Sequence, residues 1–262
     1  MGMADVKVGK LYLVGLGPGG EDLLTPRAVS ALKDCDTVIG YHLYIRQVED
    51  LLSGKERIAM ELGQEMERAN RAVELASSGR VVGVISSGDA GIYGMSGPVF
   101  LALSEIGWDG TSPQVETVPG VSAMQAAAAL LGSPLMQDFC AISLSNLLTP
   151  WEAIERRLKA AAQGDFVVAL YNPRSRRRDW QLLEARRIMM DHRPASTPVG
   201  IVREAFRPGQ QVTVTNLAHL EEQVESVDMV TIVLIGNSTT YIQAGMMATP
   251  RGYEEKITSP GV

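Results

Sequence analysis

Short runs of apolar residues, separated by helix-length segments of mixed polarity, recur along the whole sequence. Seven such runs occupy residues 10–17, 36–40, 81–87, 139–144, 166–171, 198–202 and 230–236. They do not alternate apolar with polar side chains, and most are rich in β-branched residues. Continuous runs of this kind are typical of strands that are covered on both faces, as in a parallel sheet between layers of helices. The pattern therefore predicts an α/β protein.

The segments between the runs carry helix-start and helix-stop signals. Thr25 followed by Pro26 is typical of an N-cap and first helical position. Residues 71–78 predict a helix that ends at Gly79, in the left-handed conformation that glycine adopts easily. Residues 211–215 alternate polar with apolar side chains and predict an antiparallel edge strand.

A proline and a glycine interrupt the chain at residues 118–120, between two series of strands and helices. Adjacent proline and glycine mark a turn, and a short interdomain hinge fits there. We expect an α/β domain at residues 1–118, a second at 119–240, and a C-terminal tail at 241–262. The length of 262 residues is sufficient for two such domains.

Composition narrows the functional class. The net charge of −6 argues against a nucleic-acid partner. Cys35 and Cys140 lack the spacing of a disulfide framework or zinc site, and the three histidines are scattered, so no metal site is expected. No apolar run approaches the length of a membrane span, and the N-terminus has no signal segment. We expect a cytoplasmic enzyme without a membrane partner.

A glycine-rich loop at residues 14–20 follows the first apolar run. It contains the pattern G-x-G-x-x-G at Gly15, Gly17 and Gly20. In dinucleotide-binding folds this pattern cradles a pyrophosphate, but here Pro18 removes a backbone N–H from the loop. The acidic residue that would bind ribose hydroxyls is replaced by Gly40-Tyr41. A nucleotide-binding oxidoreductase is therefore a minor alternative.

A second glycine loop, residues 86–97, follows another buried run and carries Asp89. It is expected at the carboxyl edge of the same sheet, where open α/β sheets bind ligands. A carboxylate there would suit an adenosyl ligand with a cationic amino-acid tail. An alternative role for Asp89 is to cap the next helix.

Three motifs in order, GxGPG in the first loop, the GDxxxYG-like residues 88–94 and VPGVSA at 118–123, resemble the tetrapyrrole methylases. These are class III S-adenosylmethionine-dependent methyltransferases, and the similarity spans residues 10–238. Further segments are similar to the branch of the family that methylates carbon 17 of precorrin-3B. These segments are residues 38–45, 61–69, 139–151, 170–178 and 200–210.

The resemblance implies two α/β domains, with mainly parallel or mixed sheets, that flank a cofactor cleft. S-adenosylmethionine would lie in the cleft and leave as S-adenosylhomocysteine, the tetrapyrrole would lie above it, and the enzyme would be a homodimer. The implied cofactor-binding residues are Pro18, Ser87, Gly88, Asp89, Ile92, Ser122, Ala123, Asn172, Glu204, Ala205 and Thr231. Ala90 departs from the family's commoner GDP sequence, which leaves the exact contacts of the second loop open.

The activity implied is methylation of precorrin-3B at carbon 17 with ring contraction to precorrin-4, in cobalamin biosynthesis. Alternatives are the cobalt-precorrin-3 methyltransferase of the anaerobic route, a class III methyltransferase acting on protein or RNA, and a non-enzymatic nucleotide-binding module. Methyl transfer needs alignment more than a base. Loss of a hydroxyl proton during ring contraction would benefit from a base. Glu65 and Asp89 are candidates by carboxylate chemistry alone, and Glu65 is otherwise a solvated helix-start carboxylate.

Four arginines follow the apolar run at 166–171, namely Arg174, Arg176, Arg177 and Arg178. Guanidinium groups bind carboxylates through paired hydrogen bonds, and the substrate carries acetate and propionate arms. We expect Arg174, Arg176 or Arg177 to bind the macrocycle. The alternative is a solvated loop.

Overall fold

The computed structural model describes residues 8–252, which fall into two compact units. The first unit ends at Ala123 and the second begins at Met124. The division follows the Pro119-Gly120 turn by a few residues. No helix among residues 8–252 is long and apolar enough to cross a membrane.

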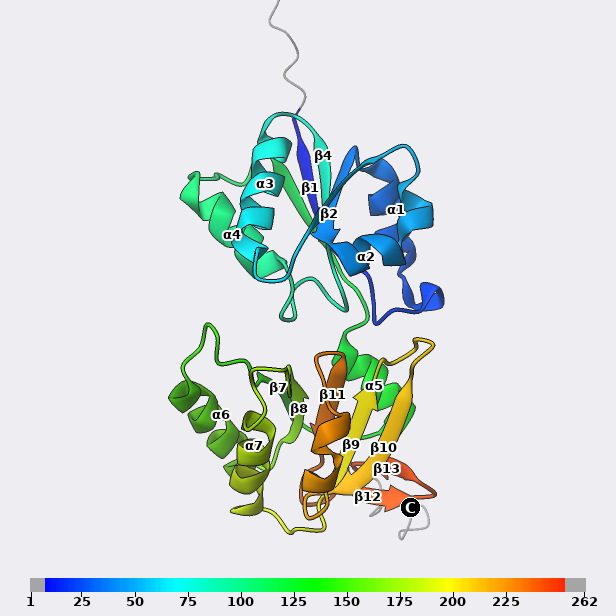
Figure 1. Cartoon of the computed structure of the whole chain (residues 1–262), viewed down its shortest axis with the longest axis vertical. Helices are drawn as coiled ribbons and strands as arrows, with labels where there is room; N and C mark the ends of the chain where they lie inside the picture. Colours follow the sequence, from blue (N-terminus) through cyan, green and yellow to red (C-terminus); the bar gives the residue numbers. More distant parts are fainter. Residues whose placement is uncertain (1–7, 253–262) are drawn as a thin grey trace, which may run out of the picture. The chain divides into compact units, whose positions relative to one another are not determined.

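The first unit is built on a sheet of five parallel strands in the order β3-β2-β4-β1-β5 (Figure 1). The strands are β1 (Lys10–Gly15), β2 (Thr37–Tyr41), β3 (Glu56–Met60), β4 (Val81–Ser86) and β5 (Gln114–Val118). Four α-helices join them: α1 (Pro26–Asp34), α2 (His42–Gln47), α3 (Glu65–Ser77) and α4 (Ser96–Glu105). The short 3-10 helices η1 (Glu21–Leu23) and η2 (Glu49–Leu52) complete the connections.

Both faces of this sheet are covered, which explains the continuous apolar runs. Leu11 and Leu13 of β1 belong to the core beneath α3 and α4. Tyr12 and Val14, which point the opposite way, belong to the core with α1. The prediction of buried parallel strands is therefore confirmed for this unit.

The predicted helix boundaries hold where capping chemistry defines them. The Thr25 hydroxyl accepts a hydrogen bond from the backbone N–H of Ala28 at 3.1 Å, and Pro26 is the first residue of α1. Gly79 follows α3 with a φ of +90°. However, α3 begins at Glu65, six residues before the predicted start, because its first turns are more polar than the apolar pattern requires.

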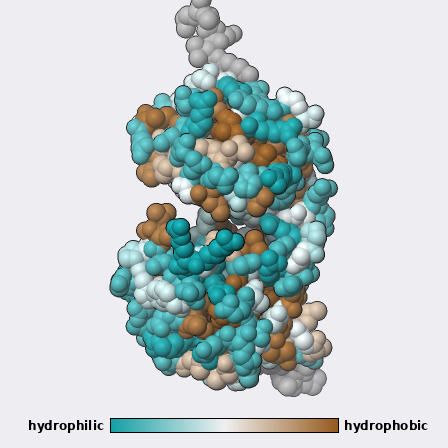
Figure 2. Space-filling view, in the orientation of Figure 1, coloured by the Kyte–Doolittle hydropathy of each residue, from teal (hydrophilic) through white to brown (hydrophobic). Residues whose placement is uncertain are grey.

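The second unit has a mixed sheet in the order β10-β9-β11-β8-β7. Its strands are β7 (Phe139–Ser143), β8 (Val167–Tyr171), β9 (Pro198–Arg203), β10 (Gln211–Asn216) and β11 (Thr231–Ile235). Only β7 and β8 pair in parallel, and β10 is the antiparallel edge strand that the alternation at residues 211–215 predicts. The main core packs this sheet against α6 (Trp151–Gln163), α7 (Gln181–Met190) and η3 (Glu221–Ser226). Much of the outward surface is hydrophilic (Figure 2).

The other face of the second sheet is covered by α5 (Ala123–Leu131), whose Leu131 reaches Gly200 of β9. Beside it, β12 (Tyr241–Gln243) and β13 (Met246–Ala248) form a hairpin, and β13 pairs in parallel with β6 (Gly132–Ser133). The expectation of a tail beginning at residue 241 is thus wrong for this segment. The reason is that Met247 is fully buried. Residues 253–262 lie outside the described residues.

Candidate functional site

Three loops meet at the carboxyl end of the first sheet. The first loop (residues 15–20), the second (86–97) and the third (118–123) follow β1, β4 and β5, which are neighbours in the sheet. Gly17 and Gly88 form an isolated bridge between the first two loops. The carboxyl ends of the strands are where open α/β sheets bind ligands, so the loops form a candidate site.

Glycine allows the three loops to pack backbone against backbone. A Cβ atom on Gly15 would lie 2.7 Å from both the Gly120 nitrogen and the Gly88 carbonyl oxygen. A Cβ on Gly120 would overlap that same carbonyl oxygen. Gly17 and Gly88 also have φ angles of +73° and +68°, which glycine adopts without steric cost. These glycines therefore shape the loops themselves.

Asp89 ties the second loop to the third. One carboxylate oxygen accepts the backbone N–H of Gly91 at 2.8 Å, and the other accepts that of Gly120 at 3.0 Å. The alternative of a helix cap is wrong, because Met95 is the N-cap of α4. Both carboxylate oxygens of Asp89 are already in use as acceptors from the backbone.

The predicted cofactor residues of the first unit all lie in these loops. Pro18 and Ser122 are buried, whereas Ser87, Ile92 and Ala123 are half-buried. Sequence reasoning did not single out Tyr93, which has a φ of +53° and an exposed side chain. A positive φ is uncommon for an aromatic residue and often marks a functional loop. Its signal in the sequence was the tyrosine of the GDxxxYG-like motif.

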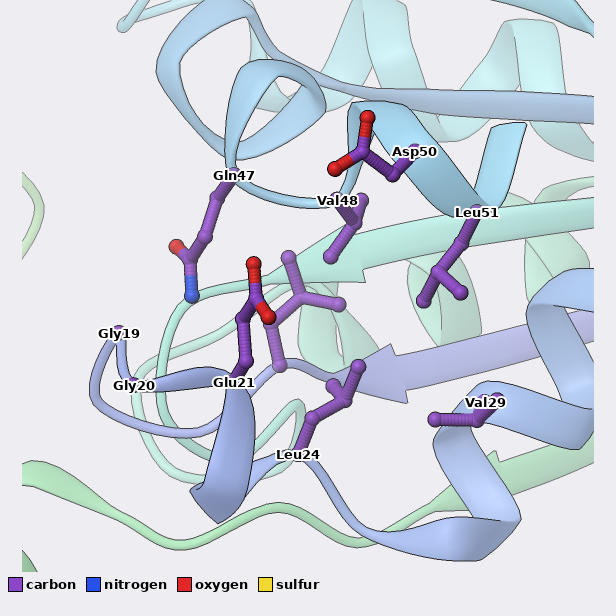
Figure 3. A pocket seen from close by; sticks show the side chains of 10 residues that line it. Gly19, Gly20, Glu21, Leu24, Val29, Gln47, Val48, Asp50 and Leu51 are labelled. Carbon is purple, nitrogen blue, oxygen red and sulfur yellow. The ribbon is translucent and has the colours of Figure 1, made fainter. Parts of the chain in front are cut away.

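A separate cavity of about 250 Å³ lies between the first loop and the segments of α1, α2 and η2 (Figure 3). Its walls combine apolar side chains with two acids, and none of the predicted cofactor residues lines it. The lining residues are Leu16, Gly19, Gly20, Glu21, Leu24, Val29, Gln47, Val48, Asp50 and Leu51. Sequence reasoning missed this cavity because its walls come from three separate segments.

In the second unit, the predicted residues Asn172, Glu204 and Thr231 lie along one edge of the sheet. Strand β11 runs antiparallel to β8 and β9, so its first residue lies beside their last ones, and Thr231 pairs with Arg203. Asn172 has a φ of +51°, and its side-chain amide donates to the Ser143 hydroxyl at 3.0 Å. Glu204 has a φ of +48°, and Ala205 is buried beside it.

Charged and polar side chains along this edge of the sheet are bonded to one another. Arg203 donates to the Asp228 carboxylate at 2.9 Å and pairs with Glu204 at 2.5 Å. The hydrogen bond from Arg203 to Asp228, together with the nearby Glu204 charge, raises the pKa of the guanidinium above its ordinary value. The Thr231 hydroxyl donates to Asp228 at 2.8 Å. The edge is therefore polar and internally bonded.

The arginine run divides into anchored and free residues. Arg178 is buried and donates to the carbonyl oxygen of Asn172 at 2.8 Å, and burial lowers the pKa of its guanidinium. Arg174 donates to the Val224 carbonyl at 3.1 Å and pairs with Glu225 at 2.9 Å. Arg176 and Arg177 are exposed between these anchors.

The second carboxylate candidate, Glu65, lies at the start of α3 and is half-buried. One of its carboxylate oxygens accepts the backbone N–H of Gly63 at 3.0 Å. This is the geometry of a helix-start carboxylate. Glu65 is thus bound to the backbone just before its own helix, and Asp89 to the backbone of the second and third loops.

Comparison with known proteins identifies the family. The family model described as Tetrapyrrole (Corrin/Porphyrin) Methylases matches residues 10–221, which is most of the chain. The chain belongs to the tetrapyrrole methylases. The motifs on which the resemblance was based lie within or directly beside the three loops of the first unit.

Among relatives in this family, a cobalt-factor III methyltransferase of Priestia megaterium is 47% identical over 251 residues. The match covers 95% of this chain but 46% of that relative, so the chain spans about half its length. A probable cobalt-factor III C(17)-methyltransferase of Salmonella typhimurium is 45% identical, with 93% of this chain and 99% of the relative covered. A precorrin-3B C(17)-methyltransferase of a Sinorhizobium species is 40% identical, with 94% and 97% covered.

Solved structures of tetrapyrrole methylases share the fold. The crystal structure of the methyltransferase CobJ superposes with a TM-score of 0.87 at 37% identity, covering 92% of this chain and 100% of that one. Uroporphyrin-III C-methyltransferase from Thermus thermophilus, complexed with S-adenosylhomocysteine, has a TM-score of 0.69 at 26% identity, with 87% and 97% covered. The expected tetrapyrrole methylase fold is thereby confirmed.

Proposed function

We propose that this chain is an S-adenosylmethionine-dependent methyltransferase that methylates carbon 17 of precorrin-3B, or of its cobalt-containing counterpart, with ring contraction. The observation that carries the proposal is the 40% identity to a precorrin-3B C(17)-methyltransferase across 97% of that relative's length. The match therefore covers nearly the whole of the relative's chain. The reaction belongs to cobalamin biosynthesis.

The loops of the first unit fit S-adenosylmethionine better than a dinucleotide. Pro18 lacks the N–H that a pyrophosphate would need, and it is buried in the first loop. Asp89 places a negative charge at the meeting point of the second and third loops. A cationic ligand is favoured there, and S-adenosylmethionine carries a sulfonium and an ammonium group. The proposed contacts are Pro18, Ser87, Gly88, Asp89, Ile92, Ser122 and Ala123.

In the second unit, the resemblance supports Asn172, Glu204, Ala205 and Thr231 as further cofactor contacts. Asn172 and Glu204 have left-handed backbone conformations, which cost energy for residues other than glycine. Strain of this kind is common at binding sites, where the surrounding structure maintains it. Substitution of each residue, with cofactor affinity as the measurement, tests this set independently of the loops.

When bound, S-adenosylmethionine supplies an electrophilic methyl group. The role of the chain is then to hold the cofactor and the macrocycle in line and to exclude water. Glu65 and Asp89 remain the carboxylates to test as the base for ring contraction. Their bonds to Gly63, Gly91 and Gly120 favour a structural role over proton transfer.

The second candidate substrate is the cobalt-containing macrocycle, because two of the relatives with higher sequence identity are named for it. The cobalt-factor III relatives from Priestia and Salmonella are 47% and 45% identical, against 40% for the precorrin-3B relative. Purified protein, S-adenosylmethionine and each macrocycle in turn should be incubated without oxygen, and the products analysed by mass spectrometry. Gain of one methyl group by either macrocycle supports the proposal. Binding of S-adenosylhomocysteine without methylation of either macrocycle would refute it.

We also infer that the enzyme is cytoplasmic and homodimeric. Both cysteines are free, and free cysteines are typical of a reducing compartment. The family resemblance supports the dimer. Light scattering of the purified protein measures the assembly directly.

A further inference from the structure

Two adjacent leucines are unusually exposed in the loop between β7 and α6. Leu147 is 78% exposed and Leu148 is 99% exposed. Trp180, at the start of α7, is also 45% exposed. Single exposed apolar residues are ordinary, but a group of large ones usually marks a binding surface.

The loop that carries the leucines is held at both ends. Before them, Asn146 accepts a hydrogen bond from the side chain of Gln181 at 3.1 Å, and Gln181 is buried. After them, the Trp151 ring packs edge-on against Trp180 with the ring centroids 4.7 Å apart. The two leucines therefore project from a loop whose ends are held in place. Their exposure is a consequence of the fold.

Free positive charges lie on the neighbouring segment. Ser175 and Arg178 form a two-bond bridge, which places Arg176 and Arg177 at the tip of a tight turn. This turn precedes Trp180, whose ring packs against Trp151 directly after the leucine loop. Because β7 and β8 are parallel neighbours, the segments that follow them leave the same edge of the sheet. In Figure 2 hydrophobic surface lies next to hydrophilic surface where the chain leads into α6.

We propose that Leu147, Leu148 and Trp180 form an apolar platform for the face of the tetrapyrrole, with Arg176 and Arg177 placed for its peripheral carboxylates. This inference rests on the proposed function. The macrocycle combines an apolar ring with carboxylate arms, and this edge combines apolar side chains with unpaired guanidinium groups. A protein with a net charge of −6 needs such a local cationic patch to bind a polycarboxylate.

The platform can be tested with an octacarboxylate porphyrin as the probe, added to the whole protein, with quenching of tryptophan fluorescence as the signal. Leu147→Asn and Leu148→Asn should each weaken porphyrin binding about tenfold, since each loses the burial of a large apolar side chain. Their affinity for S-adenosylhomocysteine should not change. Leu101→Asn is the matched control, because Leu101 is 54% exposed on α4 in the other unit.

Several results would overturn the platform. One is porphyrin affinity that is the same in both leucine variants and wild type, and another is a wild-type protein that shows no quenching. Loss of dimer mass in the variants, with porphyrin binding intact, would assign the leucines to self-association. Loss of binding to phosphatidylglycerol vesicles alone would assign them to a lipid surface. Failure of the proposed function gives a distinct result, since the wild-type protein would then methylate neither macrocycle.

Discussion

Gly17 and Gly88 exchange both of their backbone hydrogen bonds, with N···O distances of 3.0 and 2.7 Å. The bridge joins loops that are about seventy residues apart in the sequence. A change in the backbone of one loop is therefore transmitted directly to the other. The first two predictions follow from this arrangement of the loops.

Gly120→Ala should disrupt the meeting point of the three loops, because the added Cβ would overlap the Gly88 carbonyl. Overpacking of this kind costs about 1–3 kcal/mol, so Tm should fall by several degrees. The affinity for S-adenosylhomocysteine should fall as well, as measured by calorimetry. Gly97→Ala is the control, since no atom lies within 4 Å of its added Cβ. Unchanged affinity in Gly120→Ala would contradict the assignment of these loops to the cofactor.

Asp89→Asn should weaken binding of S-adenosylhomocysteine about tenfold. An amide can accept only one of the two N–H groups that the carboxylate accepts, and a hydrogen bond to a charged group is worth about 1.5–3 kcal/mol. Asp109→Asn removes a carboxylate that also accepts a nearby backbone N–H, from Thr111, in another loop of the same unit. That control should keep wild-type affinity. Equal affinities in the two variants would mean that the link to Gly120 is irrelevant to the cofactor.

Arg176→Ala and Arg177→Ala should each raise the KM for the tetrapyrrole about fivefold and leave S-adenosylhomocysteine affinity unchanged. Raised salt should weaken substrate binding to the wild-type protein more than to a variant that lacks one of these two arginines. Arg174→Ala should instead lower the free energy of unfolding by about 1 kcal/mol, because it loses its bonds to Val224 and Glu225. If neither tip variant changes the KM, the turn is a solvated loop.

Cys35 should resist thiol reagents until the first unit unfolds. Burial raises the pKa of its thiol from 9.0 to about 12, so the reactive thiolate is scarce at neutral pH. A pKa that is raised in the folded state stabilises the fold below the ordinary value, and this contribution is lost as pH rises toward the folded value. Between about pH 9 and pH 11, the urea midpoint should therefore fall more steeply in wild type than in Cys35→Ala. Labelling at the same rate in folded and unfolded protein would contradict the burial.

Thermal shift distinguishes the cofactor from a dinucleotide. S-adenosylhomocysteine should raise Tm in a concentration-dependent way, since a ligand that binds only the folded state stabilises it by mass action. NAD and NADP should leave Tm unchanged, because Pro18 removes a donor from the first loop. A saturable shift with either dinucleotide would restore the oxidoreductase alternative.

The sequence predicted the inner strands of both sheets and the edge strands β7 and β10, but it missed the two edge strands of the first sheet. All seven apolar runs are strands. Six of them are inner strands, which are apolar along their length because both faces are covered, whereas β7 is a partly exposed edge strand. Strands β3 and β5 were missed, since they lie at the edges of their sheet and carry exposed glutamate, arginine and glutamine. The sequence also did not predict that β11 runs antiparallel to β8 and β9. Burial on both faces imposes the same apolar pattern in both directions.

The sequence located the glycine loops but not the contacts that their side chains make. The glycine motifs located the loops, because close backbone packing restricts those positions to glycine. The role of Asp89 depends on Gly120, which is 31 residues away in sequence, and no local pattern encodes that contact. The same holds for Arg174 and Arg178, whose partners are set by tertiary contacts. Charge alone did not distinguish them from Arg176 and Arg177.

The pairing of β13 with β6 sets the order in which the protein can fold during synthesis. The first unit has its last strand once Val118 has been made, so it can fold while the ribosome is still translating the second. The second unit must wait, because Gly132 and Ser133 have no partner strand until Met247 and Ala248 emerge. Until then, the chain around β6 is an unpaired segment on a nascent protein.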